Sequence, residues 1–228
     1  MEDMLTRTRV LLGDEKVKKI TNLKLVIFGV GGVGSYALEA VVRAGVKEVI
    51  LIDYDTINIT NLNRQLIATT ENLGELKVNA AAKRIKNINP EIKVTVFPLK
   101  VDEENVFKFI PLDTDYVIDA IDDVKGKTSI IKYCVENNIK IISSMGTGNR
   151  TMFKDYIITD ISKTHGCPLA RKLRKKLKEN NIFTGVSVMF SPITPDIIVK
   201  DKIIGSISFV PAQGGLKLAE KVINDIIQ

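Results

Sequence analysis

The chain has 228 residues, 45% of them hydrophobic, and its 33 basic and 27 acidic residues give a formal net charge of +6. This length can bury the core of one α/β domain, and the moderate positive charge allows a polyanionic partner without requiring one. The two cysteines are too few and too distant for a disulfide framework or a C-x-x-C zinc site, and without an apolar signal region or membrane span we expect a soluble, cytoplasmic protein.

Strand and helix patterns alternate along the first half of the chain. After a short helix over residues 14–21, apolar runs predict five strands and amphipathic runs predict four helices. This alternation is typical of a Rossmann-like doubly wound α/β sheet, parallel and covered on both faces. The strands are expected near 24–29, 47–52, 92–97, 115–121 and 139–144, and the helices over 33–44, 75–87, 103–109 and 125–137.

The pattern changes after Met145. Three further runs, 154–161, 183–190 and 203–210, read as strands, and we expect them to extend the sheet in antiparallel directions. A last amphipathic helix over 212–227 should close the fold. We therefore predict a single domain over 1–228, with a nucleotide-binding half (1–150) and an antiparallel half (151–228).

A glycine-rich turn follows the first strand. Gly29, Gly31 and Gly34 fit G-x-G-x-x-G, with Gly32 inside the motif, and the turn opens an amphipathic helix. Glycines let the main chain approach a phosphate, and the start of the helix attracts the anion. Asp53, at the end of the second strand, is placed to accept the ribose hydroxyls. The motif predicts an adenine nucleotide and leaves NAD, FAD and ATP open.

The residues beyond Asp53 favour ATP. A nicotinamide enzyme usually needs a general acid such as histidine, and the only histidine, His165, falls in an expected loop. Attack of a carboxylate on the α-phosphate of ATP builds negative charge that Arg, Lys and Mg²⁺ stabilise. The residues that follow Asp53 in the sequence include side chains that commonly contact phosphate: Asp55, Thr60, Asn61, Asn63, Arg64, Gln65 and Lys77.

Four blocks in the first 150 residues resemble the ubiquitin-activating-enzyme-like adenylating proteins, the ThiF/MoeB superfamily. They are GVGGVG, LIDYDTINITNLNRQ, GELKVNAAAKRIKNINP and DYVIDAIDD. RTRVLLGDE, SSMGTGN, DISKTHGCPLARKLRKKL and IGSISFVPAQGGL are similar to its tRNA threonylcarbamoyladenosine dehydratase branch. The resemblance implies ATP-dependent activation of the threonine carboxylate of the modified adenosine, followed by ring closure with net loss of water.

The resemblance also implies that residues 151–228 supply substrate and dimer contacts, and it implies roles for individual residues. Asp53 would hold the ribose, and Asp122 would hold Mg²⁺. Arg7 would reach the γ-phosphate across a homodimer interface, with Arg9 as its near neighbour. The glycines Gly29, Gly31, Gly32 and Gly34 would contact the nucleotide, and Asp55, Asn61, Asn63, Arg64 and Lys77 would complete its binding set, with Asn61, Arg64 and Lys77 on the phosphates.

Other readings of these motifs stay open. The runner-up is an enzyme that adenylates the C-terminal glycine of a ubiquitin-like sulfur carrier, although such proteins usually carry two C-x-x-C pairs, which this chain lacks. More distant alternatives are a nicotinamide-dependent oxidoreductase and a nucleotide-binding regulatory module without turnover. A sulfur-transfer or ubiquitin-like protein therefore stays among the expected partners, beside tRNA.

A basic helix and two cysteines complete the candidate features. Residues 169–178 combine a narrow leucine stripe with uninterrupted positive charge, which suits the phosphate backbone of tRNA as well as an ordinary solvated face. Cys167 has no evident base except His165, so we expect no thioester chemistry there. Cys134 lies on an apolar helix face and is expected in the core, and Asp119, in an apolar strand, is expected to make structural hydrogen bonds.

Overall fold

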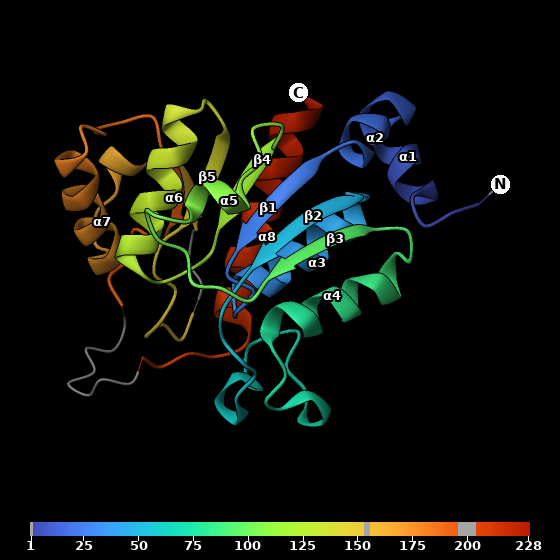
Figure 1. The fold of residues 1–228 in the computed structure, drawn as a ribbon, viewed down its shortest axis with the longest axis horizontal. Coiled ribbons are helices and arrows are strands. Elements are labelled where there is room, and N and C mark those ends of the chain that lie inside the picture. The colour runs from blue at the N-terminus through green and yellow to red at the C-terminus, as the bar shows by residue number, and fades with distance from the viewer. Residues whose placement is uncertain (1, 153–155, 196–203) are drawn as a thin grey trace.

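The computed structural model describes residues 2–152, 156–195 and 204–228 and has a central sheet flanked by helices (Figure 1). The described residues include three short 3₁₀ turns, at Ile59–Asn61, Thr70–Asn72 and Ile161–Lys163. The strands are β1 (Lys24–Phe28), β2 (Glu48–Ile52), β3 (Lys93–Phe97), β4 (Tyr116–Asp119), β5 (Lys140–Ser144), β6 (Ile157–Asp160) and β7 (Ser187–Phe190). The α-helices are α1 (Thr6–Leu12), α2 (Asp14–Thr21), α3 (Gly34–Ala44), α4 (Lys77–Ile88), α5 (Val106–Phe109), α6 (Val124–Glu136), α7 (Pro168–Glu179) and α8 (Phe209–Ile227).

The seven strands form one sheet in the order β3-β2-β1-β4-β5-β7-β6. The chain runs outward from β1 to β3 and then returns to β4 on the other side of β1. The carboxyl ends of β1 and β4 therefore lie side by side where the strand order reverses, and this is where open α/β sheets bind ligands. The predicted doubly wound sheet, with a parallel first half, is confirmed.

The antiparallel extension is confirmed for β6, which pairs antiparallel with β7. The same expectation was wrong for β7, which runs parallel to β5. The reason is the path of the chain between β6 and β7. Residues 161–167 return toward the carboxyl edge, where the Sγ atom of Cys167 lies 3.7 Å from the position of a Cβ atom on Gly146. The helix α7 then runs back toward the amino edge of the sheet, and β7 runs toward the carboxyl edge beside β5.

Both faces of the sheet are covered. Leu25 and Ile27 of β1 belong to a core shared with α3, α4 and α8, whereas Val26 and Phe28 belong to a second core shared with α5, α6 and α7. Burial on both faces explains why the first strands read as unbroken apolar runs. The helices cover both faces of the sheet but not its carboxyl edge, and polar side chains are concentrated at that edge.

The expected strand over 203–210 was wrong. Residue 203 lies outside the described residues, residues 204–207 form no regular element, and α8 begins at Phe209, three residues before the expected start of the last helix. The main-chain groups of this stretch are bonded by loop side chains instead of a strand. Asn149 Oδ1 accepts from the N–H of Gly205 at 2.7 Å, and Asn63 Nδ2 donates to the carbonyl of Ser206 at 3.0 Å.

Other boundaries differ by smaller amounts. The helix expected over 103–109 is reduced to α5, and the sequence did not predict α1. The strand expected over 154–161 is observed from Ile157, and its positions 154 and 155 lie outside the described residues. Among the helices that the structure describes, none has the length and apolar character needed to cross a bilayer.

The helix α8 lies directly against α3. A Cβ atom on Gly215 would come within 2.3 Å of the carbonyl oxygen of Val33 and 2.8 Å of the nitrogen of Ala37, so only glycine allows this approach. At the first turn of α8, Pro211 lies 3.3 Å from the Cβ position of Gly32. Proline suits this position, because an N–H in the first turn has no helical acceptor. The first turn of α8 thus closes over the glycine turn that follows β1.

Candidate functional site

The glycine turn is held tightly between β1 and α3. Gly29 has a φ of 82° and donates its N–H to the carbonyl of Ile52 at 2.8 Å. A Cβ atom on Gly34 would lie 1.7 Å from the carbonyl oxygen of Gly29, which excludes every other residue there. At Gly31 the space is open, with only the amide of Gln65 at 3.6 Å. The turn therefore presents main chain at the start of an 11-residue helix, as anion binding requires.

Asp53 couples this turn to the end of β2. Its Oδ2 atom accepts from the N–H of Val30 at 2.9 Å, and its Oδ1 atom accepts from the N–H of Asp55 at 3.0 Å. Burial raises the pKa of Asp53 above its ordinary value, against the opposing charge of Lys77 and these two hydrogen bonds. The carboxylate is thus fixed beside the turn, and each of its oxygens keeps one further acceptor site for a ribose hydroxyl.

Lys77 and Asp55 form an ion pair at the same edge. The Nζ atom of Lys77 lies 2.6 Å from Oδ2 of Asp55, with the lysine side chain 7% exposed and the aspartate 46% exposed. Lys77 is the first residue of α4, so its ammonium comes from a helix that follows a long connection after β2. Because the ammonium of Lys77 is buried while the carboxylate of Asp55 is half-exposed, a phosphate at this edge can replace Asp55 as the partner of Lys77.

The 3₁₀ turn Ile59–Asn61 positions the remaining polar residues of the second block. Asn61 is buried, and its Oδ1 atom accepts from the N–H of Asn58 at 3.0 Å. Arg64 donates to the carbonyl of Thr60 and to Oδ1 of Asn63. The side chains of Asn61 and Asn63 thus bond groups within the loop and hold its shape. Arg64 Cγ lies 3.5 Å from the Cβ position of Gly32. The loop brings Arg64 to the glycine turn.

Asp122 lies on the loop between β4 and α6 and is exposed. The loop is fixed on both sides. Oδ1 of Asp119 accepts from the N–H of Ile121 at 3.2 Å, and Asp123 caps α6 by accepting from the N–H of Gly126 at 2.7 Å. Within the described ranges, no group of three or more His, Cys, Asp or Glu side chains forms a ready metal site.

Asp119 makes the structural hydrogen bonds that the sequence predicted. Its Oδ2 atom accepts from Nζ of Lys127 at 2.9 Å and from Oγ of Ser143 at 2.6 Å, and all three side chains are fully buried. Lys127 was not predicted to take part, because its burial depends on how α6 packs on β4 and β5. This network anchors the strand end that precedes Asp122.

Negative charge is concentrated at the carboxyl edge. Tyr54 is exposed between Asp53 and Asp55, and its pKa is raised, first by the charge of Asp55, then by burial and by the charge of Asp122. Nζ of Lys100 lies 5.8 Å from the centre of the tyrosine ring. Several carboxylates thus lie at the same edge as the Lys77 ammonium and the open glycine turn, and carboxylate oxygens are ligands that divalent cations prefer.

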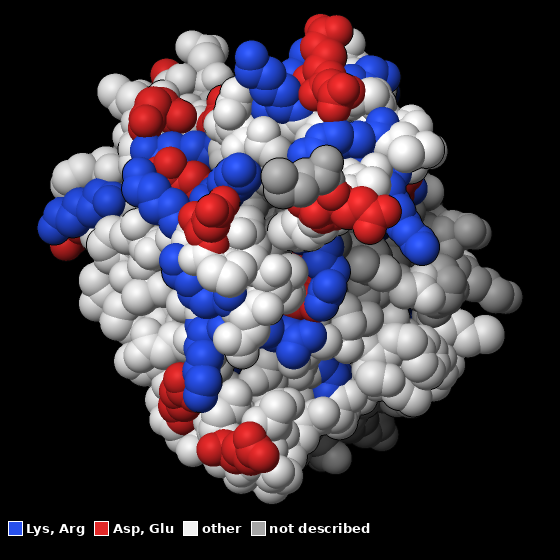
Figure 2. Space-filling model, turned by 90° about the vertical axis from the view of Figure 1, so that its right-hand side faces the viewer, with Lys and Arg blue, Asp and Glu red and all other residues white. Residues whose placement is uncertain are grey.

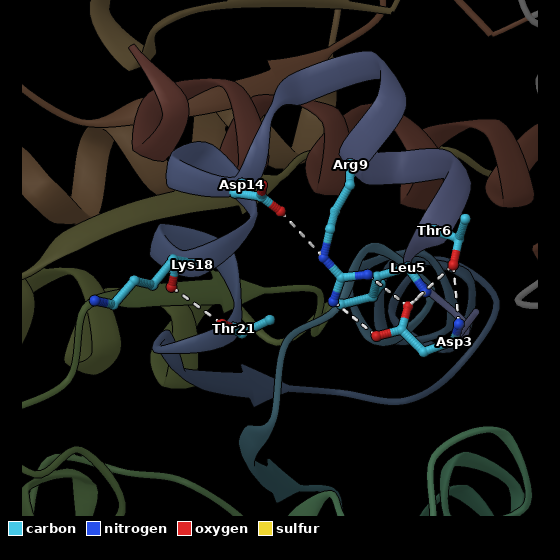
Figure 3. A network of polar contacts seen from close by, with 7 residues as sticks. All are labelled: Asp3, Leu5, Thr6, Arg9, Asp14, Lys18 and Thr21. Carbon is cyan, nitrogen blue, oxygen red and sulfur yellow. Dashed lines mark hydrogen bonds and ion pairs between the residues drawn. The ribbon is translucent and has the colours of Figure 1, made fainter. Parts of the chain in front are cut away.

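Arg7 and Arg9 differ in their surroundings, although both lie on α1. Arg9 forms two hydrogen bonds of 2.7 Å with the carboxylate of Asp3 and an ion pair of 3.4 Å with Asp14 (Figure 3). Arg7 is exposed and has no ion-pair partner in the part of the chain that the structure describes. The preceding Leu5 is buried against Gly45, whose Cβ position is 2.9 Å away. Arg7 is therefore the arginine available to a second molecule.

The basic helix α7 lies at the opposite end of the molecule from α1 and α4 (Figure 1). Its leucines Leu173 and Leu177 are buried, as predicted. Arg174 does not belong to the free positive face, because it donates to the carbonyl and hydroxyl of Thr164. The basic residues of α7 that remain exposed and have no ion pair within the described ranges are Arg171, Lys172, Lys175 and Lys178. On the face that carries α1, α2 and α4, by contrast, acidic and basic residues are mixed (Figure 2).

Both cysteines are buried. Cys134 lies in the core as expected, and burial raises the pKa of its thiol. Cys167 precedes α7, and its Sγ atom accepts from the N–H of Ala170 at 3.5 Å. The ring of His165 contacts Phe190, with 5.5 Å between ring centres. Cys167 therefore acts as a helix cap in this structure.

Comparisons with known proteins agree along the whole chain. The ThiF family matches residues 5–227. The tRNA threonylcarbamoyladenosine dehydratase of Bacillus subtilis is 37% identical, with 100% of this chain and 96% of that protein aligned. The crystal structure of the Escherichia coli tRNA N6-threonylcarbamoyladenosine dehydratase with ATP has a TM-score of 0.92 and 33% identity, and covers 98% of this chain and 93% of its own. The same enzyme with AMP also has a TM-score of 0.92 and 33% identity, over 97% and 92%.

Proposed function

The chain belongs to the ThiF family, and on that premise we propose that it is an ATP-dependent tRNA threonylcarbamoyladenosine dehydratase. The observation that carries the proposal is a similarity that extends beyond the nucleotide-binding half. It includes nearly all of the chain and nearly all of an enzyme of that activity crystallised with ATP. We accordingly expect the protein in the cytoplasm, with tRNA as its substrate.

The reaction has two steps. The threonine carboxylate of the modified adenosine beside the anticodon attacks the α-phosphate of ATP, forming an acyl-adenylate and releasing pyrophosphate. A nitrogen or oxygen of the same modification then attacks the activated carbonyl, a ring closes, and AMP leaves. Because the nucleophile is already attached, the second step requires little more than positioning. The net change to the nucleoside is the loss of water.

The proposed roles of the site residues follow their geometry. Main-chain N–H groups around Gly31 and Gly32 bind phosphate, and Asp53 accepts the ribose hydroxyls. Lys77 and Arg64 stabilise the charge that develops on phosphorus and on the departing pyrophosphate. Asp55 releases Lys77 to the nucleotide, and Asn61 and Asn63 hold the loop that carries Arg64. Gly29 and Gly34 keep the turn in shape.

Mg²⁺ fits the donors at this edge. Magnesium is usually held by one or two carboxylates together with substrate phosphates and water, so a three-residue cluster is not required. The exposed Asp122 would supply one carboxylate, in a loop anchored by Asp119 and Asp123. Bound there, the ion would neutralise charge on the phosphates of ATP. The two anchors hold the main chain on either side of Asp122 without help from the ion.

A homodimer would complete the site. Arg7, on α1, is exposed and unpaired within the described residues, while its neighbour Arg9 is engaged by Asp3 and Asp14. A partner subunit placed against α1 would receive Arg7 near its γ-phosphate. For tRNA, the exposed cations of α7 offer a surface of one sign at the end of the molecule opposite α1.

The second candidate is adenylation of the C-terminal glycine of a ubiquitin-like sulfur carrier, by the same phosphate chemistry. The lack of any C-x-x-C pair and the full-length similarity to a tRNA enzyme favour the first candidate. The experiment that separates them is pyrophosphate exchange into ATP. Exchange that depends on tRNA bearing threonylcarbamoyladenosine supports the proposal, and exchange that depends on a small protein ending in Gly-Gly refutes it. Mass analysis of the tRNA nucleosides should show a product lighter by the mass of one water molecule.

A further inference from the structure

Arg150 and Tyr156 lie close together at the carboxyl edge of the sheet. Arg150 follows β5, and Tyr156 directly precedes β6, which begins at this edge because it runs antiparallel to β7. Both side chains are more than nine-tenths buried, with 6% of Arg150 and 8% of Tyr156 exposed. Burial raises the pKa of Tyr156 to about 12, and the charge of Arg150 acts in the opposite direction. At neutral pH the hydroxyl therefore keeps its proton and can donate beside a positive charge.

Each of the two side chains has an unsatisfied donor. Nε of Arg150 and the hydroxyl of Tyr156 are two of the four buried side-chain atoms that have no hydrogen bond among residues 2–152, 156–195 and 204–228. A buried donor without an acceptor destabilises the folded protein, and the cost is larger when the donor belongs to a charged group. Two such donors in one buried cluster, one of them cationic, favour an anionic ligand.

The loop that carries Arg150 is bonded to the proposed nucleotide site through a short bridge. Asn149 donates its N–H to the carbonyl of Gly205 at 2.8 Å, and its Oδ1 atom accepts from the N–H of Gly205 at 2.7 Å. The carbonyl of Ser206 accepts from Nδ2 of Asn63, in the loop proposed to bind phosphates. The strand β5 is also the neighbour of β4, which leads into the proposed magnesium loop. The cluster therefore adjoins the proposed ATP site on its β5 side.

We propose that Arg150 and Tyr156 bind the carboxylate that the enzyme activates, the threonine carboxylate of the modified adenosine. The inference rests on the proposed function for the identity of this substrate. Nε of Arg150 and the hydroxyl of Tyr156 donate to one carboxylate oxygen. The other oxygen stays free to attack the α-phosphorus of ATP, where a new P–O bond forms as the bond to pyrophosphate breaks. Charge-assisted hydrogen bonds of this kind are strong, and they distinguish the modified adenosine from an unmodified one, which has no carboxylate.

Tyr156→Phe tests the neutral donor. The variant removes a hydroxyl that has no partner among the described residues, so the melting temperature should be equal or higher. The Kd for tRNA bearing threonylcarbamoyladenosine should rise about tenfold, as expected for loss of a hydrogen bond to a charged group, with the Kd for ATP unchanged. Tyr116→Phe is the matched control, because the buried hydroxyl of Tyr116 donates to Oδ2 of Asp225 at 2.8 Å. It should lower the melting temperature and leave both Kd values unchanged.

Arg150→Met tests the charged donor. The wild type should bind modified tRNA at least about tenfold more tightly than the same tRNA with an unmodified adenosine, and in Arg150→Met the two Kd values should be equal. Arg150→Lys, which keeps the charge, should restore part of the difference. The inference is overturned if Arg150→Met and Tyr156→Phe keep the wild-type preference for modified tRNA. It is also overturned if the variants bind both tRNAs and ATP more weakly by the same factor, which a purely structural role would produce.

The same titrations distinguish this inference from the proposed function. If the wild type dehydrates the modified nucleoside and the variants keep its preference for modified tRNA, only the inference fails. If the wild type neither prefers modified tRNA nor acts on it, both fail.

Discussion

The Nζ atom of Lys77 lies 2.6 Å from Oδ2 of Asp55, and the main-chain N–H of Lys77 donates to the carbonyl of Asp55 at 3.0 Å. The start of α4 is thus joined to the end of β2 by side chain and main chain together. This double connection holds a buried ammonium at the edge of the sheet where Asp53 meets the glycine turn.

Replacing Lys77 should stop adenylation. In Lys77→Met we expect pyrophosphate exchange to fall at least about 100-fold, because the variant removes a cation that we propose stabilises the α-phosphate transition state. Since Lys77 is buried rather than exposed, the unfolding free energy should also fall, by about 1 kcal/mol. Denaturant titration checks the fold. The control is Lys93→Met, which breaks only the surface pair with Glu48. Normal exchange in Lys77→Met would refute the assigned role.

Asp122→Asn should change the response to magnesium. If Asp122 supplies a carboxylate to Mg²⁺, the concentration of Mg²⁺ that gives half-maximal exchange should rise about tenfold or more, since a neutral amide is a weaker ligand than a carboxylate. Stability should change little, because the side chain is exposed. Asp113→Asn, which alters an exposed acid paired with Lys24 away from this loop, is the control. An unchanged Mg²⁺ dependence of exchange would show that Asp122 does not bind Mg²⁺.

Charge reversal on α7 should weaken tRNA binding. With Lys172→Glu and Lys175→Glu combined, we expect the Kd for tRNA to rise and the slope of log affinity against log salt to become shallower by about 0.7–0.9 for each phosphate that the protein no longer neutralises. The matched control reverses Lys16 and Lys19, which are exposed on α2. Equal effects of both pairs would indicate a general charge effect instead of a tRNA surface on α7. The affinity for ATP should be unchanged in both.

Cys167→Ser should remain active. The thiol caps α7 by accepting from the N–H of Ala170, and a serine hydroxyl is a better acceptor at the same place. Dehydration of tRNA and exchange should therefore proceed at rates close to those of the wild type. Mass analysis under turnover should detect no acyl adduct on the protein. A Cys167→Ser variant that is folded but inactive would support a thioester mechanism instead.

The pairing of Asp3 with Arg9 predicts a pH dependence. Hydrogen bonding to Arg9 lowers the pKa of Asp3 below its ordinary value of 3.8. A carboxyl group whose pKa is lowered by folding stabilises the folded state above the unfolded pKa, and this contribution disappears as the pH falls. The melting temperature should therefore be higher in the wild type than in Asp3→Asn at neutral pH. Below pH 3.8 the difference should shrink. A difference that does not vary with pH would contradict the pairing.

The central strands of the first half were predictable because β1, β2 and β4 are buried on both faces and are therefore continuous apolar runs. Gly29 and Gly45 separate β1 and β2 from the amphipathic helix α3, so the strand and helix patterns are distinct in the sequence. The spacing of Gly29 and Asp53, together with the strand, turn and helix pattern around them, predicts that both lie at the same edge of the sheet. Their actual relation, in which Asp53 binds the N–H of Val30 beside the turn, needed the parallel register of β1 and β2.

The second half was harder for a physical reason. Residues 203–210 alternate as a strand does, but whether alternation produces a strand depends on a free sheet edge, and Asn63 and Asn149 bond the main chain of Gly205 and Ser206 instead. Likewise, no local pattern shows that Lys77 and Lys127 are buried, because burial of a charge depends on how distant parts of the chain pack around it.

The proximity of Pro211 to Gly32 has a consequence for synthesis in the cell. The glycine turn and α3 are synthesised well before α8, which packs directly on α3. Until α8 has been made, the apolar side of α3 is open to water, so a nascent chain exposes a surface that folding factors and proteases can recognise. Packing of α8 on α3 buries this surface, which couples quality control of the protein to the presence of α8.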